Sequence, residues 1–407
     1  IGAYAKLDNG ALYGTNFLLI PDLLASEGYI RWLGTFQGYR EVSLKTLNDI
    51  NTETVRTWNQ AYSTINLVNN VLEALPVVTD PDKKNQLEGE ALLIRGMLYF
   101  ELVRLYGLPY EAGSANTQLG VPLVLTAAKS LEQASTQQAR NTVAEVYQQV
   151  ITDLTRAESL LPEDNGVRGD MYTAAGFLAR VYLQQGDYAN ALAKADKVIS
   201  SGVYQLTPNV VTPFRTKNSF ESIFEIQQND QSNAGTSNDG LTTFYASLGG
   251  IGRGDVQVEP DFAALYDTTD ARFTDLIYEG TGLRAGRLRT CKFTAYADNI
   301  PIIRLAEMYL IRAEANFRLG SAVGATPTED INLIRARAGV KEYNKVTLDQ
   351  IILERQLELA FEGFRIHDIK RLKGTTGEYA YNAPELVLPI PRRELDANPN
   401  LVQNEGY

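Results

Sequence analysis

Glu354–Arg365 reads ERQLELAFEGFR, and the end of the chain, Leu388–Tyr407, reads LPIPRRELDANPNLVQNEGY. The first stretch lies within Ile351–Leu372, where apolar side chains recur at helical spacing and predict one helix. Charged side chains stand beside that apolar face, and we expect them to pair with one another or with their neighbours: Glu354, Glu358, Glu362, Arg355, Arg365, Asp368 and Arg371. Such pairing would make Arg365 a contributor to stability and not to ligand binding. The proline-containing tail has no helical period, so we expect it to lie against the body of the protein.

Helical periods and capping residues predict a series of further helices. One occupies about 53–75 and contains Trp58, which we expect in the core. Another carries apolar residues from Leu87 to Leu105. The other helices begin at capping residues, which are Thr142, Asp170, Asp187, Thr326 and Thr347. Two antiparallel pairs resemble degenerate tetratricopeptide repeats, which stack into one continuous helical core; they are Ala174–Gln185 with Tyr188–Ser201, and Ile302–Leu319 with Asp330–Ala338.

The sequence changes character between residues 207 and 300. Ser222–Gln227, SIFEIQ, alternates in hydrophobicity and predicts a short strand. Leu248–Gly254, LGGIGRG, lacks both the phosphate-loop pattern and the dinucleotide fingerprint. The polar run Asn229–Gly240 lacks the oxygen ligands of an EF-hand loop. This insertion therefore predicts loops without a nucleotide or calcium motif.

Composition excludes several classes of function. The formal net charge of −11 argues against a nucleic-acid partner, and 44% hydrophobic residues argue against disorder. Cys291 and His367 are each the only residue of their kind, which rules out an intrachain disulfide and any Cys/His zinc or two-His iron site within one chain. We expect Cys291 to be a small buried side chain and His367 to be held by the scaffold. No cofactor and no metal site is predicted, and no run approaches the roughly 20 apolar residues of a membrane span.

The two opening stretches closely resemble the C-terminal signature of the SusD/RagB family. Further similar stretches are WNQAYSTINLVNNVL at Trp58–Leu72, GEALLIRGMLYFELVRLYGLP at Gly89–Pro109, AAGFLARVYLQQGDYANALAKADKVISSGVYQL at Ala174–Leu206, IIRLAEMYLIRAEANFRLG at Ile302–Gly320 and INLIRARAG at Ile331–Gly339. The resemblance implies a mainly α, SusD-like fold, with residues 1–407 as a single domain. In it, a helical repeat scaffold of about 1–206 and 301–375 carries an irregular ligand-binding insertion of about 207–300 and a tail of 376–407.

Members of that family are nutrient-binding lipoproteins on the surface of Bacteroidetes. The resemblance implies a non-enzymatic protein, lipid-anchored on the extracellular face of the outer membrane, whose expected ligand is an oligosaccharide. It further implies delivery of that ligand to a SusC-like TonB-dependent transporter, which the protein caps as a lid. Ile1–Leu7 resembles a segment inside family members, after the signal peptide and the acylated cysteine, so we expect a trimmed N-terminus. Two alternatives stay open: a peptide-binding relative, and a glycosidase built on a pair of the chain's many carboxylates.

Sugar binding needs flat apolar rings for C–H faces, and amides, carboxylates or guanidinium groups for hydroxyls, all exposed on loops. Glu27–Arg40, EGYIRWLGTFQGYR, offers such groups without a clean period, and in family members the loop after the first helices often lines the ligand site. Its candidates are Tyr29, Arg31, Trp32, Phe36 and Tyr39. We predict that the Trp32 ring is exposed and stacks on the ligand; the alternative is that these rings fill a small core. The mid-chain insertion, from which family sites also draw, adds Asn229, Asp230, Asn233, Asn238, Tyr245 and Arg253.

Overall fold

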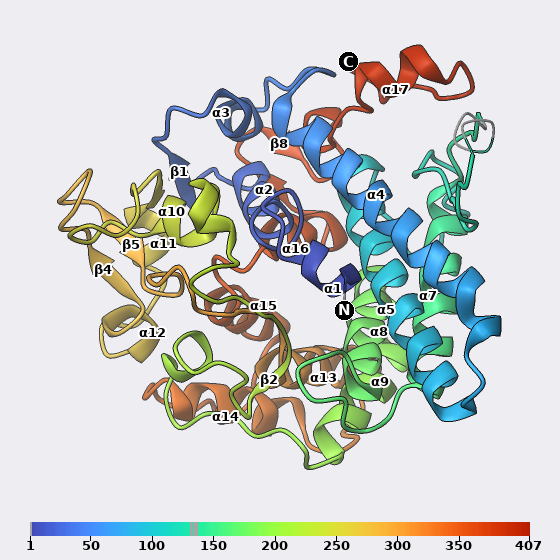
Figure 1. The fold of residues 1–407 in the computed structure, drawn as a ribbon. Helices are drawn as coiled ribbons and strands as arrows, with labels where there is room; N and C mark the ends of the chain where they lie inside the picture. The colour runs from blue at the N-terminus through green and yellow to red at the C-terminus, as the bar shows by residue number, and fades with distance from the viewer. Residues whose placement is uncertain (1, 131–132, 134–136) are drawn as a thin grey trace.

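The computed structural model describes residues 2–130, 133 and 137–407, so Ile1 of the N-terminal segment lies outside the described part. Helices make up most of the regular structure, and the strands are short and pair only in twos among these residues. The predicted mainly α fold is confirmed. Figure 1 shows the long helices between residues 52 and 200 on one side of the molecule and much of the irregular insertion on the other.

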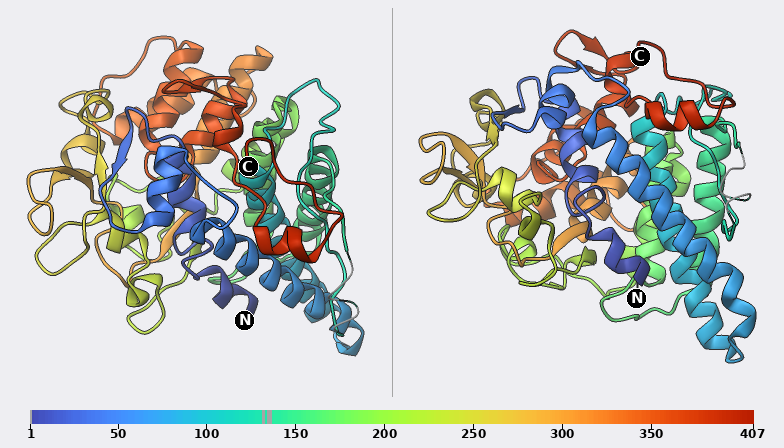
Figure 2. Two further views of the ribbon diagram at one scale, coloured as in Figure 1. Left: turned by 90° about the horizontal axis from the view of Figure 1, so that it is seen from above. Right: turned by 45° about the horizontal axis from the view of Figure 1, so that its top comes forward.

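The long helices form a continuous series in which each member packs on the next (Figures 1 and 2). The members are α4 (Thr52–Ala74), α5 (Pro81–Tyr106), α7 (Val143–Leu160), α8 (Met171–Gln185), α9 (Tyr188–Ser200), α13 (Leu305–Leu319), α14 (Pro327–Arg337) and α15 (Leu348–Glu358). The two predicted repeat-like pairs are α8 with α9 and α13 with α14, and each pair is in contact. The predicted stacking of helix pairs is therefore present, with α9 packed on α13 across the insertion that separates them in sequence.

The capping residues read from the sequence begin the helices as predicted. Thr142, Thr326 and Thr347 each form a reciprocal capping box, and Asp170 and Asp187 accept from backbone N–H groups of the first turn. Helix α5 is longer than its apolar period indicated. It starts at Pro81 because the Asp80 carboxylate accepts hydrogen bonds from two first-turn amides, and proline fits the first helical position.

The remaining elements are short. The other helices are α1 (Gly2–Leu7), α2 (Asn16–Leu24), α3 (Gln37–Leu44), α10 (Leu241–Tyr245), α11 (Pro260–Ala263), α12 (Ala271–Thr274), α16 (Arg365–Arg371) and α17 (Arg392–Ala397). The strand pairs, all antiparallel, are β1 (Ile30–Trp32) with β3 (Val256–Val258), β2 (Ser222–Ile226) with β6 (Ile300–Arg304), β4 (Ile277–Glu279) with β5 (Leu288–Thr290), and β7 (Thr375–Thr376) with β8 (Tyr379–Ala380). Strand β2 confirms the strand predicted over Ser222–Gln227.

The helix predicted over Ile351–Leu372 is wrong as one unit, because it breaks between α15 and α16. Phe361 and Gly363 adopt φ values of 68° and 79°, which no right-handed helix contains. A Cβ on Gly363 would lie 2.8 Å from the Leu18 Cα, so glycine allows this turn to press on the backbone of α2. Packing against α2 thus overrides the helical period of the sequence.

The three glutamates of this region are buried, but their partners lie in other elements. The pairs, with N–O distances, are Glu354 with Arg272 (2.6 Å) and Arg335 (2.9 Å), Glu358 with Arg304 (3.0 Å) and Arg337 (2.5 Å), and Glu362 with Arg304 (2.8 Å) and Lys292 (2.7 Å). Glu221, which precedes β2, pairs with Arg304 (2.8 Å) as well. We call this set the buried charge network. It ties the insertion, which supplies Glu221, Arg272 and Lys292, to the scaffold.

The expectation that the charged residues of this region pair with one another or with their neighbours is therefore met only in part, since the three glutamates pair with residues of other elements. Arg355 and Arg371 pair with Asp368 instead, and Arg371 also pairs with Glu314. The Arg365 side chain forms no hydrogen bond or ion pair with any residue that the structure describes. The expectation that Arg365 stabilises the fold through an ion pair has no support in this geometry.

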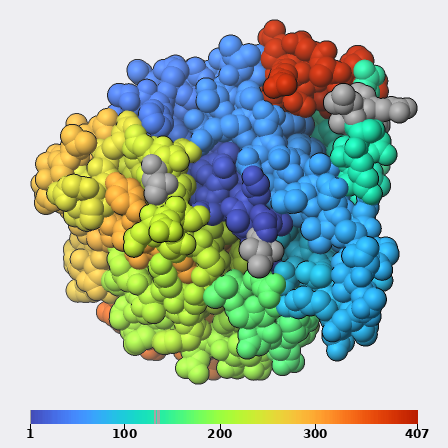
Figure 3. Space-filling view, in the orientation of Figure 1, coloured from blue at the N-terminus to red at the C-terminus, as the bar shows by residue number. Residues whose placement is uncertain are grey.

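The C-terminal tail lies against the body, as predicted (Figure 3). The Leu388 N–H donates to the Leu105 carbonyl of α5 (2.8 Å), and the Asn404 amide donates to the Tyr106 carbonyl (2.9 Å). Arg140 donates to the Val402 carbonyl from a buried position (2.9 Å). These bonds hold the proline-containing segment in one path although it has no long helix of its own.

Three expectations about single residues have different outcomes. Trp58 is 3% exposed and packs on Tyr62 and Tyr106, which confirms its place in the core. His367 is buried, and this burial lowers the pKa of its imidazole well below the usual value, as suits a scaffold residue. Cys291 is only partly buried, contrary to expectation. None of the described helices combines the length and the apolar character needed to cross a membrane.

Candidate functional site

An open cleft of about 660 Å³ lies beside strand β1. This volume is within the range of ordinary small-molecule sites. We call it the β1 cleft, and its lining residues are Ser26, Glu27, Gly28, Ile30, Arg31, Trp32, Leu33, Gly34, Arg40, Ser43, Leu44, Glu259 and Asp261. They come from β1 and its flanking loops, from α3, and from the start of α11, which lie together in Figure 1.

The cleft exists because β1 pairs with β3, far along the chain. Outside the strands the ladder continues, since the Glu259 N–H donates to the Tyr29 carbonyl (3.0 Å) and the Leu33 N–H to the Asp255 carbonyl (2.6 Å). Across the two segments, Arg31 Nε lies 2.8 Å from Glu259 Oε1, with the Arg31 side chain 62% exposed. The pairing therefore brings the two acidic residues Glu259 and Asp261 to a loop of the N-terminal region.

The β1 cleft combines charged and apolar groups at its surface. Glu27, Arg31, Arg40 and Asp261 are exposed, and Leu44 is 55% exposed. Carboxylates accept hydrogen bonds and guanidinium groups donate them, so such a rim can bind a ligand rich in hydroxyls. In the part of the chain that the structure describes, no group of three or more His, Cys, Asp or Glu residues is placed to hold a metal ion.

The side chain of Glu27 is held in place by Lys45. Lys45, whose φ of 54° turns the chain after α3, donates from Nζ to Glu27 Oε1 (3.0 Å) and to Ser26 Oγ (2.8 Å). Burial lowers the pKa of the Lys45 ammonium, while its contact with Glu27 opposes that shift. One oxygen of the exposed Glu27 carboxylate is thereby held in place, and the carboxylate can still accept from a ligand.

The prediction that the Trp32 ring is exposed is wrong, since Trp32 is 8% exposed. Its ring packs on Tyr39 (centroids 5.1 Å apart) and on Phe244 (5.4 Å), in a small aromatic core that Phe36 also joins. A Cβ on Gly34 would lie 2.4 Å from the Trp32 ring, so glycine lets the chain cross that ring closely. The alternative stated from the sequence, that these rings fill a small core, describes Trp32, Phe36 and Tyr39.

Tyr29 and Tyr245 are also buried and do not line the β1 cleft. Tyr29 stacks on Phe361 with ring centroids 5.4 Å apart, and its hydroxyl accepts from the Phe361 N–H. Tyr245 is fully buried and donates from its hydroxyl to Asp22 Oδ2 (3.2 Å). Burial raises the pKa of Asp22 to about 7 and raises that of both tyrosines well above the usual value.

The candidates from the insertion do not line the β1 cleft. Asn229 shapes a turn, because its Oδ1 accepts from the Gln231 and Ser232 N–H groups (2.9 Å each). Asn233 is buried and donates to the Asn229 carbonyl (2.8 Å). Asp230 and Asn238 are exposed away from the cleft lining.

Arg253 contacts the N-terminal candidate segment, Glu27–Arg40, unlike the other candidates from the insertion. Its guanidinium lies over the Phe36 ring (4.6 Å to the centroid), donates to Thr35 Oγ1 (3.2 Å) and pairs with Asp255 (3.1 Å). The two predicted segments therefore meet, through Arg253 and Phe36 and through Phe244 and Trp32. Of the eleven candidates, Arg31 and Trp32 line the cleft.

Several lining residues were not predicted from the sequence. Glu27 and Arg40 are the first and last residues of the segment Glu27–Arg40, but the candidates chosen within it were mostly aromatic residues. Glu259 and Asp261 lie outside both segments, and only the β1–β3 pairing brings them in. The alternation Val256–Gln257–Val258 next to Pro260 was the available signal for a strand followed by a helix start.

Comparison with known proteins identifies the family. Residues 32–183 match the family described as "Starch-binding associating with outer membrane", and residues 280–386 match the SusD family. The SusD-like protein P2 of Formosa agariphila is 28% identical over all of this chain and 91% of its own length. The starch-binding protein SusD of Bacteroides thetaiotaomicron is 39% identical over 127 residues, which are 28% of this chain and 22% of that protein.

Two solved structures show the same fold over almost the whole chain. A SusD superfamily protein from Bacteroides thetaiotaomicron superposes with a TM-score of 0.87 at 27% identity, covering 99% of this chain and 97% of that one. Another from Bacteroides vulgatus gives 0.88 at 26% identity, covering 100% and 97%. With the C-terminal signature, the helical series and these matches, the chain belongs to the SusD/RagB family.

Proposed function

We propose that this protein binds an extracellular carbohydrate without catalysis, and that the β1 cleft is its binding site. The observation that carries the proposal is the set of exposed acidic residues and arginines that, together with the exposed Leu44, lines an open cleft of about 660 Å³. The description of the matching family as starch-binding and the name of the starch-binding relative support a carbohydrate as the ligand class. A cleft on this scale accommodates a few sugar units.

Carbohydrate chemistry fits the arrangement of the rim. Sugar hydroxyls both donate and accept, so the carboxylates of Glu27 and Asp261 and the guanidinium of Arg40 can each bind one. Arg40 makes no side-chain hydrogen bond or ion pair among the described residues, which leaves its donors available. Leu44, which is 55% exposed, offers apolar surface for the C–H face of a sugar.

Isothermal titration calorimetry with neutral oligosaccharides and with oligopeptides tests this proposal. We expect an oligosaccharide to bind, and Arg40→Ala and Asp261→Asn each to weaken it about tenfold or more, since a hydrogen bond to a charged group contributes roughly 1.5–3 kcal/mol. Arg393→Ala is the matched control, because Arg393 is exposed on α17 outside the cleft. Binding that both cleft variants leave unchanged would place the site elsewhere.

The same sample distinguishes the alternatives stated from the sequence. Selective binding of oligopeptides would favour the peptide-binding relative. Release of reducing sugar from a bound glycan would favour the glycosidase, which uses two carboxylates beside the scissile bond. We expect neither result.

The proposal extends to a cellular role. The protein would be lipid-anchored at the outer face of the outer membrane and would act as the lid of a SusC-like TonB-dependent transporter, to which it passes the carbohydrate. The description of the matching family as associating with the outer membrane supports this location. Extraction of the native, lipidated protein in mild detergent should bring a large β-barrel with it. Recovery as a monomer alone would contradict the lid mechanism.

A further inference from the structure

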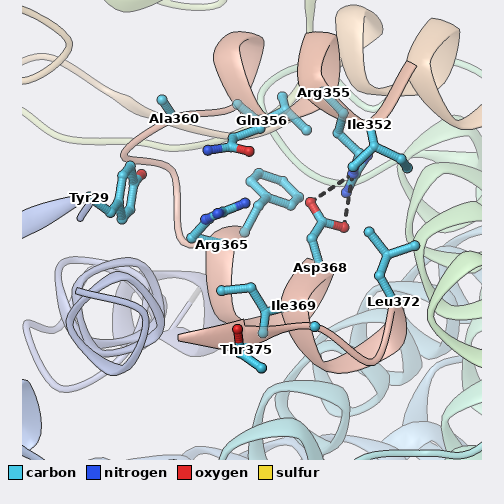
Figure 4. Close-up of a pocket in the computed structure, with 13 residues that line it drawn as sticks. Tyr29, Ile352, Arg355, Gln356, Ala360, Arg365, Asp368, Ile369, Leu372 and Thr375 are labelled. Atoms are coloured by element: carbon cyan, nitrogen blue, oxygen red, sulfur yellow. Dashed lines mark hydrogen bonds and ion pairs between the residues drawn. The ribbon is translucent and has the colours of Figure 1, made fainter. Parts of the chain in front are cut away.

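A second pocket lies outside the β1 cleft, between α15 and α16 (Figure 4). It has a volume of about 180 Å³ and is lined by residues between Ile352 and Thr375, together with Tyr29 from the N-terminal region. Apolar side chains form most of its wall, namely those of Tyr29, Ile352, Leu359, Phe364, Ile369 and Leu372. The break between the two helices creates this space, since one continuous helix could not bring its two halves to face each other.

The acidic residue of this pocket, Asp368, already forms ion pairs with two arginines. Asp368 accepts from Arg355 Nε (3.0 Å) and from Arg371 Nε (2.6 Å). Burial alone would raise the pKa of the Asp368 carboxyl, but the two guanidinium groups outweigh it and hold that pKa below its usual value. Asp368 therefore stays ionised, and its charge is matched by side chains other than Arg365.

Arg365 brings a positive charge to the same space without a partner. Its side chain is half-buried and makes no hydrogen bond or ion pair with the residues that the structure describes. Figure 4 shows its guanidinium among Tyr29, Gln356, Asp368 and Ile369, within the ring of lining residues. A guanidinium beside apolar walls matches a carboxylate in charge and in bidentate geometry.

We propose that this pocket binds a small organic carboxylate with an apolar body, such as an aromatic acid. Its carboxylate would accept two hydrogen bonds from Arg365, and its body would pack on Ile352, Phe364 and Ile369. The apolar wall favours this class over phosphate or sulfate, which need several donors. The pocket and the β1 cleft have no lining residue in common, so the two sites are proposed independently.

Isothermal titration calorimetry with 3-phenylpropionate and its neutral amide tests the proposal on the unaltered protein. We expect the acid to bind at least about tenfold more tightly than the amide. Arg365→Gln should remove this preference, while Arg393→Gln, which replaces an exposed arginine far from the pocket in sequence, should leave it intact. Equal affinity for acid and amide, or binding of neither, would overturn the proposal without any variant.

Two further measurements keep the result clear. Thermal melts should show Arg365→Gln as stable as the parent protein, because the substitution breaks no side-chain hydrogen bond or ion pair with a described residue. Oligosaccharide binding at the β1 cleft should be the same in both proteins. A preference for the acid that survives Arg365→Gln would show that another group recognises the carboxylate and that Arg365 is not the ligand-binding residue.

Discussion

Arg304→Met tests whether the buried charge network holds the insertion on the scaffold. Arg304 is 2% exposed and pairs with Glu221 (2.8 Å), Glu358 (3.0 Å) and Glu362 (2.8 Å). Removing one partner of a buried pair costs roughly 3–5 kcal/mol, because a charge is left uncompensated. Here Arg337 remains on Glu221 and Glu358, and Lys292 remains on Glu362, so each carboxylate keeps at least one cation. We therefore expect Arg304→Met to lower the free energy of unfolding by about 3–5 kcal/mol in total, and not by three times that amount.

The loss of stability in Arg304→Met should become smaller as the pH falls. Burial alone would raise the pKa of the Glu358 and Glu362 carboxyls, but the arginines outweigh it and hold both below the usual value. Their stabilisation is therefore present above the unfolded pKa of about 4.5 and is lost as the pH falls through the folded pKa. Without Arg304 these pKa values rise, so the deficit of the variant should shrink as the solution becomes acidic.

Urea unfolding followed by tryptophan fluorescence, at pH 7 and at about pH 3, which lies below the unfolded pKa of these carboxyls, measures both effects. Arg31→Met is the control, since the Arg31–Glu259 pair has an arginine side chain 62% exposed and exposed pairs contribute at most about 1 kcal/mol. A loss for Arg304→Met no larger than that of the control would refute the reasoning. So would a deficit that does not change with pH.

Three further predictions concern single residues. Trp32→Ala should destabilise the protein by roughly 3–5 kcal/mol in urea unfolding, as should Trp58→Ala, because both indoles are packed in cores; a loss under about 1 kcal/mol would contradict the packing. Asp22 has its pKa raised to about 7 by burial, so the folded state keeps a proton that the unfolded chain releases, and stability falls as pH rises from about 4 to 7. Asp22→Asn should remove this fall, worth at most about 4 kcal/mol, and parallel pH profiles for the two proteins would refute the assignment. Arg365→Ala should change the unfolding free energy by no more than about 0.5 kcal/mol, and a larger loss in the same urea titration would reveal a partner for its guanidinium.

Local patterns allowed much of the scaffold to be predicted. Capping boxes at Thr142, Thr326 and Thr347 are complete within four residues, so the sequence alone predicts these helix starts. The break before Arg365 was missed because it depends on Gly363 meeting the backbone of α2, a contact between residues far apart in the chain. The apolar period continues through the break and gives no local sign of it.

The candidate site was predicted less well, for the same physical reason. The sequence shows that aromatic residues gather near Trp32, but exposure depends on what covers them. Phe244, from the insertion, covers the Trp32 ring, and no pattern near either residue reveals that contact. Likewise Glu259 reaches the cleft only through the pairing of β1 with β3. Tertiary contacts of this kind decide which of several plausible side chains faces a ligand.

Because β1 pairs with β3, binding of a ligand in the β1 cleft requires that both parts of the chain are folded. The two strands, Ile30–Trp32 and Val256–Val258, lie far apart in the sequence, so a fragment lacking either one has no β1 cleft. A ligand held between them binds only the fully assembled state and raises the unfolding free energy by RT ln(1 + [L]/Kd). Saturating ligand at about 100 times Kd would add about 2.7 kcal/mol. Under the proposed function, a carbohydrate bound in the β1 cleft thus stabilises the folded protein, and the unliganded protein unfolds first.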